Sequence, residues 1–133
     1  MLYNLVEYLR NEFPWEMIYV NIYQKLSGQD FVPDRCAIVK ETSGALSPWF
    51  QFSKNTYQVI TRDADLTKAR KLAYDILAVL NNKFGLLLPA VIVDGNNYLS
   101  KHTAQISAIQ SPYELGTDDS GRTLYTTNYY ILM

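Results

Sequence analysis

The sequence predicts an α+β domain, with a mainly antiparallel sheet of about four to five strands and two helices packed on one of its faces. Two observations lead to this fold class. A strand-like segment runs directly into a strongly amphipathic helical segment in the middle of the chain, and several other strand-like segments are separated by turn sequences. Strands joined by turns favour antiparallel neighbours, and each amphipathic helix must bury its apolar stripe against them.

The central unit is the best-defined part of the pattern. Residues 55–62 alternate between two faces and are rich in β-branched and aromatic residues, as is typical of a strand. Apolar residues then recur at helical spacing. We expect Asp63 or Asp65 to cap the first turn of this helix and Gly85 to end it in a left-handed conformation. The expected apolar stripe comprises Leu66, Ala69, Ala73, Ile76, Leu77, Leu80 and Phe84.

The first part of the chain predicts one helix and two strands. Residues 1–13 carry apolar side chains at helical spacing, and Pro14 closes the segment because the residue before a proline avoids helical geometry. Residues 17–23 and 36–42 have strand composition. The domain of 133 residues is large enough to bury a core without disulfides or metals.

Residues 43–54 are expected to form a long loop. Ser-Gly and Ser-Pro pairs indicate turns, yet Trp49, Phe50 and Phe52 stand in the middle of the segment. Such a loop either folds back on the core or presents its aromatic side chains to a partner.

The last part of the chain predicts a short strand and a hairpin. Residues 90–93 form a short apolar segment before a turn. Residues 102–110 and 124–133 alternate, and the polar, turn-rich residues 113–122 between them predict a hairpin with a long tip.

Composition limits the function classes. The 12 basic and 13 acidic residues argue against a bulk electrostatic affinity for nucleic acid or an anionic membrane. The single cysteine excludes an internal disulfide framework and indicates a reducing compartment. The longest apolar run, residues 84–93, is too short to span a bilayer. The 11 tyrosines suit surfaces that become buried on assembly.

Candidate chemical residues have simpler structural interpretations. His102 is the only histidine and has no second metal ligand at a suitable spacing, so no metal site or catalytic relay is expected. Cys36 would be reactive if Arg35 lowered its pKa, but a buried small side chain is favoured. The remaining clusters read as helix capping, turn chemistry and a solvated helix face: Asp63 with Asp65; Asp118 with Asp119; and Arg62, Lys68, Arg70 and Lys71.

The arrangement resembles the minor capsid or tail-terminator (tail-completion) proteins of long-tailed bacteriophages. The resemblance covers most of the chain and is clearest from residue 55 onward. It is carried by the amino-terminal helix, the strand at 57–63, the helix at 69–74, and the segments 111–116, 121–122 and 127–131.

The resemblance implies a structural virion protein with neither catalytic activity nor a cofactor. Such a protein assembles as a homohexameric ring that caps the tail tube, stops its polymerisation and joins the head-completion complex. Its partners are copies of itself, the tail-tube protein and the connector, and DNA passes through the lumen without sequence-specific binding. Alternatives are another neck, head-closure or tail-tube ring subunit, or a small ligand-binding domain or enzyme with a pocket around His102 or Asp63.

If the resemblance holds, the contacts of the ring lie outside the core. We expect them in the aromatic loop, at the tip of the last hairpin, and on an exposed basic surface beside the central helix. The corresponding residues are Trp49, Phe50 and Phe52; Glu114, Asp118, Asp119 and Arg122; and Arg62, Arg70 and Lys71.

Overall fold

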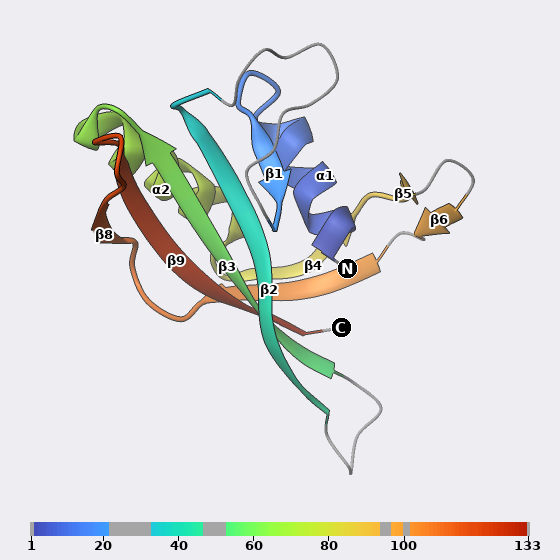
Figure 1. Ribbon diagram of the computed structural model, residues 1–133. Coiled ribbons are helices and arrows are strands. Elements are labelled where there is room, and N and C mark those ends of the chain that lie inside the picture. Colours follow the sequence, from blue (N-terminus) through green and yellow to red (C-terminus); the bar gives the residue numbers. More distant parts are fainter. Residues whose placement is uncertain (1, 22–32, 47–52, 94–96, 100–101, 133) are drawn as a thin grey trace.

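The computed structural model describes residues 2–21, 33–46, 53–93, 97–99 and 102–132, and it confirms an α+β fold with a curled, mainly antiparallel sheet (Figure 1). In chain order the elements are α1 (Leu2–Glu12), β1 (Ile18–Val20), β2 (Cys36–Leu46), β3 (Ser53–Asp63), α2 (Leu66–Leu80), β4 (Lys83–Leu88), β5 (Val91–Val93), β6 (Asn97–Leu99), β7 (His102–Ala108), β8 (Tyr113–Thr117) and β9 (Thr123–Leu132).

The main sheet contains seven strands in the described chain, so the expectation of four to five was too low. Its order is β1-β2-β3-β9-β7-β4, and β8 pairs with β9 outside this path. Strands β5 and β6 form a separate two-stranded sheet. Sequence missed β4 because its residues continued the helical pattern, and missed β8 because it lies within a turn-rich tip.

Strand β9 is the centre of the sheet. One edge pairs antiparallel with β3 over its whole length, from Thr123 opposite Asp63 to Leu132 opposite Lys54. The other edge is shared: β7 pairs with the end of β9, and β8 pairs with its beginning. The expected hairpin between residues 102–110 and 124–133 is therefore confirmed, with an extra strand in its tip.

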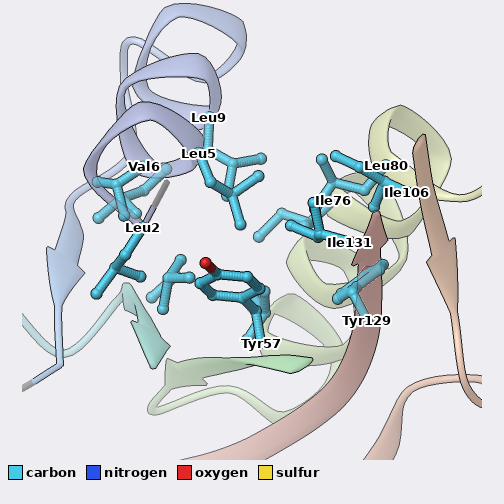
Figure 2. Packing of buried hydrophobic residues seen from close by; sticks show 14 of the residues in the cluster. Leu2, Leu5, Val6, Leu9, Tyr57, Ile76, Leu80, Ile106, Tyr129 and Ile131 are labelled. Carbon is cyan, nitrogen blue, oxygen red and sulfur yellow. The ribbon is translucent and has the colours of Figure 1, made fainter. Parts of the chain in front are cut away.

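Both helices pack on one face of the sheet and form a shared core with it (Figure 2). Leu5 and Leu9 of α1 and Ile76 of α2 converge on this face. The sheet contributes Ala37, Val39, Tyr57, Val59, Leu88, Ala104, Ile106, Tyr129 and Ile131. Each large side chain buried here contributes about 1.5–3 kcal/mol of transfer free energy. The apolar stripe of α1 is buried as its spacing predicts.

The start of α2 is confirmed, whereas its predicted end is wrong. The Asp65 carboxylate accepts a hydrogen bond from the Thr67 amide at 2.9 Å, as an N-cap should. The helix ends at Leu80, where the Asn81 amide donates to the Leu77 carbonyl. Asn82, with φ of 55°, then turns the chain. Gly85 has a positive φ as well, but it lies at an irregularity within β4.

The prediction of a long loop at residues 43–54 is wrong at both ends of the segment. Strands β2 and β3 stay paired from Cys36 opposite Arg62 to Leu46 opposite Ser53, with a bulge at Thr42. Residues of low strand propensity are held here by the neighbouring backbone. The β2–β3 hairpin extends beyond the body of the domain (Figure 1). Trp49, Phe50 and Phe52 lie outside the described residues.

Candidate interaction surface

One face of the sheet has no helix of the described chain packed on it. In Figure 1, α2 lies behind β3 and β9, and α1, drawn beside β2, packs into the same core on that face. Because side chains alternate along a strand, the residues between the core positions point to the opposite side. We call this side the uncovered face. In β3, β9 and β7 its positions are, by register, Lys54, Thr56, Gln58, Ile60, Arg62, Leu124, Thr126, Asn128, Tyr130, Leu132, Gln105 and Ser107, of which Ile60, Arg62 and Thr126 are buried.

The positions of the uncovered face in β9 and β7 carry no charge, whereas β3 contributes Lys54 and the buried Arg62 at its two ends. On the same side β2 contributes Lys40, opposite Gln58, and the buried Cys36 and Ile38. The polar groups of the uncovered face bond across strands, since the Gln58 side-chain amide donates to the Thr126 hydroxyl at 2.9 Å. The water-facing side of an antiparallel sheet ordinarily carries polar and charged residues. The part formed by β9 and β7 has no charged position and contains the exposed Tyr130, which is instead typical of the centre of a protein interface.

The uncovered face ends in an apolar hollow beside β4. The hollow has a volume of about 150 Å³ and is lined by Phe84, Gln105, Ile106, Ser107, Tyr130 and Leu132. The Phe84 side chain is 77% exposed at its rim. Leu87, which is 56% exposed, points to the same side of β4, because its neighbours Leu86 and Leu88 pack into the core. An apolar space of this size accommodates a single aromatic ring.

Arg62 does not lie on the exposed surface that the sequence predicted, and that prediction is wrong. Arg62 is the second-last residue of β3 and is 4% exposed. The guanidinium donates to the Pro33 carbonyl at 2.7 Å and to the Asp34 carbonyl at 3.2 Å. Arg62 therefore fixes the chain just before β2 and is not available as a surface contact.

Arg70 and Lys71 are exposed on α2, as expected. The Arg70 guanidinium carbon lies 4.5 Å from the centre of the Tyr74 ring. The Lys71 ammonium pairs with the Asp75 carboxylate at 2.7 Å, one helical turn away. Both cations remain accessible to a partner, and these local contacts contribute little to stability.

The tip of the last hairpin divides into exposed and structural residues. Glu114 and Asp119 are exposed. The Asp118 carboxylate accepts hydrogen bonds from the Arg122 amide at 2.9 Å, the Arg122 Nε at 2.7 Å and the Ser120 amide at 3.0 Å. These bonds, led by that of the Arg122 backbone, lower the pKa of Asp118. Asp118 and Arg122 thus shape the turn before β9.

Sequence reasoning missed an ionic cluster at the same end of the sheet. The Arg35 guanidinium lies 2.8 Å from the Glu16 carboxylate and 3.3 Å from the Asp63 carboxylate. Hydrogen bonding to Glu16 is the largest contribution that raises the pKa of Arg35. Glu16 is almost fully buried. No sequence signal joins three residues so far apart in the chain, so only the fold reveals this cluster.

The remaining candidates for chemistry are accounted for. Cys36 is buried, as predicted, and burial raises the pKa of its thiol to about 11. His102 begins β7, and its side chain lies outside the described part of the structure. Within the described residues, no three His, Cys, Asp or Glu side chains gather as metal ligands. Neither described helix has the length and apolar character needed to cross a membrane.

A scan against protein-family models and a search of curated proteins give no match to this chain.

Proposed function

We propose that this chain is a structural virion protein that caps the end of a phage tail tube as a ring. In this role it stops tube polymerisation and forms the joining surface for the head-completion complex. The resemblance of its sequence to tail-terminator proteins is the basis for assigning it to a phage particle and to the end of the tail tube. The structural observation that carries the assembly is the uncharged part of the uncovered face formed by β9 and β7, with the exposed Phe84 beside a hollow.

The uncovered face supports assembly because apolar and neutral polar surface gains more from burial than charged surface does. Aromatic residues on such a face contribute large contact areas, and exposed apolar groups that lie together mark interaction sites. Tyr130, Leu132 and Phe84 meet at the hollow and satisfy both conditions. The exposed Arg70 and Lys71 of α2 lie on the helix-covered side of the sheet, and Glu114 and Asp119 are exposed at the tip of the last hairpin. In this proposal these four residues make polar contacts outside the uncovered face.

The proposed partners are further copies of the chain, the tail-tube protein and the connector. The β2–β3 hairpin supports a reach toward the tube, because it extends beyond the domain (Figure 1). DNA would pass through the ring without being held. The near balance of 12 basic and 13 acidic residues supports this passage, since retention of DNA depends on neutralising many phosphates.

The direct test is capping of tail tubes. Tail-tube protein from the same phage is polymerised with and without the purified chain, and the products are examined by electron microscopy. We expect a ring at one tube end and shorter tubes as the chain is added in excess. Tubes of unchanged length with bare ends would contradict the function. A ring that binds tubes without limiting their length would indicate another neck subunit instead.

A second test concerns the aromatic segment between β2 and β3. Because Leu46 and Ser53 are still paired, residues 47–52 can be replaced by Asn-Gly, which forms a tight hairpin turn. We expect this variant to fold as the native chain does and to lose tube capping. Retained capping would remove Trp49, Phe50 and Phe52 from the proposed contacts and leave the fold and the ring unaffected.

A further inference from the structure

The main sheet has two backbone edges that no described strand covers. Strand β4 ends the order of the sheet and pairs only with β7. At the other margin, β1 pairs with β2 only at Ala37, Ile38 and Val39, so no described residue pairs with the outer edge of β2 from Lys40 onward. Uncovered strand edges present rows of amide and carbonyl groups that can pair with another chain.

The two edges are similar in length and match in direction. The unpaired edge of β2 spans residues 40–46, one residue more than β4, Lys83–Leu88, so residues 41–46 can align with the whole of β4. The strands β3, β9 and β7 separate them, and all four successive pairings are antiparallel. Strands β2 and β4 therefore run in the same sense, so copies related by a simple rotation can join these edges in parallel.

Charge selects the same arrangement. A parallel alignment of these two six-residue segments places Glu41 opposite Lys83 and apolar Leu46 at the end where β4 carries Leu87 and Leu88. An antiparallel alignment would place Glu41 opposite Leu88 and Lys83 opposite Leu46. Among the described residues neither Glu41 nor Lys83 forms an ion pair within its own chain. Opposite charges on facing positions of neighbouring strands are favourable.

We infer that β4 of one copy pairs in parallel with residues 41–46 of β2 in the next copy. Each free edge is thus covered by the other free edge of a neighbouring copy of the same protein. This contact uses two different surfaces, so it is a head-to-tail contact that repeats from copy to copy and forms a ring where the rotation between copies closes. It also brings a neighbour beside the exposed Phe84 and Leu87 of β4. The inference rests on the ring of the proposed function and names the surfaces that build it.

Site-specific disulfide formation tests the pairing. The variants Glu41→Cys and Lys83→Cys are prepared separately and mixed under oxidising conditions, at assembling concentration and on tail tubes. Facing residues of neighbouring strands lie within the range that a disulfide spans. We expect cross-linked dimers in the mixture and none with either variant alone. A chain that carries both cysteines should give a ladder of oligomers.

The controls exploit the buried thiol and an exposed helix position. The native chain should not cross-link, because Cys36 is fully buried and has a raised pKa. Asn11→Cys, at the exposed end of α1, should give no product when mixed with Glu41→Cys. Dimers from Lys83→Cys alone would show a symmetric β4–β4 contact and overturn the inference, as would a mixture without dimers.

Charge exchange gives an independent measurement. Glu41→Lys and Lys83→Glu should each reduce assembly, because like charges then face each other, whereas the double variant should restore it. Circular dichroism should show the native fold in all three. Rings that cap tubes without Glu41–Lys83 cross-links would overturn the edge pairing and leave the proposed function intact. Cross-linked rings that fail to cap tubes would support the edge pairing and contradict the proposed function.

Discussion

At the scale of single residues, buried charge is concentrated where β2 begins and β3 ends. Arg35 neutralises Glu16 and Asp63, and Arg62 binds the carbonyls of Pro33 and Asp34. Removal of one member of such a cluster leaves its partners buried without compensation, and this loss costs more than the intact pair contributes. These residues therefore maintain the geometry from which both the β2 edge and α2 begin.

Arg35→Ala should destabilise the protein by about 2–4 kcal/mol. This expected loss of stability is smaller than the cost of breaking a fully buried pair because 35% of the Arg35 side chain is exposed. Urea denaturation at neutral pH measures the change. The matched control is Lys71→Ala, which breaks the exposed pair with Asp75 and should change stability by less than about 0.5 kcal/mol. Equal effects of the two variants would contradict this assignment.

Asp118→Asn should lower stability in a pH-dependent way. The folded state lowers the pKa of Asp118, so ionised Asp118 stabilises the fold above the ordinary carboxyl pKa of about 4. That contribution is lost as the pH falls through the lower pKa of the folded state. The difference between native chain and variant should therefore be largest near neutral pH and shrink in acid.

The neighbouring Asp119→Asn variant makes the same change in charge at an exposed position. Its free energy of unfolding should follow that of the native chain across the same pH range, measured by denaturant titration at each pH. If Asp119→Asn reproduced the pH dependence of Asp118→Asn, net charge rather than the turn would be responsible.

At the scale of elements, sequence predicted what local periodicity determines and missed what partners impose. The helix at residues 1–13, the strand at 55–62 and the start of α2 follow from spacing and capping within a few residues. Residues 43–46 and β8 have turn-like composition, and only pairing with β3 and β9 makes them strands. Distant pairing cannot be read from neighbours in the sequence.

The candidate site shows the same division. Arg62 looks exposed in sequence because charged residues usually are, yet its acceptors come from the segment before β2, almost thirty residues earlier. The uncharged positions of the uncovered face are visible in the alternation of residues 56–60 and 124–132. Sequence could not show which face of the sheet the helices leave bare, so the meaning of these uncharged positions emerges only with the fold.

The N-cap of α2 offers a test at this scale. Asp65→Ala should lower stability by about 1 kcal/mol, because the Thr67 amide loses its acceptor. Asp65→Asn should retain most of the stability, since asparagine caps about as well as aspartate. Thermal and urea unfolding of both variants measure the difference. Equal losses would mean that the negative charge near the helix dipole, and not the hydrogen bond, stabilises the first turn.

At the scale of the whole molecule, β4 separates stability from assembly. Leu88 is fully buried in the shared core, whereas Phe84 is 77% exposed beside the hollow. Leu88→Ser should lower the free energy of unfolding by about 2–5 kcal/mol or more, as truncation of a large core residue does. Phe84→Ser should change stability by less than about 1 kcal/mol and still reduce ring formation. Denaturation and mass photometry separate the two effects, and a Phe84→Ser variant that assembles normally would exclude this surface.

The central position of β9 also determines when the domain can fold during its synthesis. Strand β3 is translated about seventy residues before the partner that covers its second edge. Contacts between such distant segments form late, and chains that wait for them expose unpaired strands. On the ribosome, the sheet and core built from α1, β2, β3 and α2 therefore cannot complete their packing until residues 123–132 leave the exit tunnel. Nascent chains stalled before residue 123 should be cleaved readily by protease, and those released beyond residue 132 should resist it.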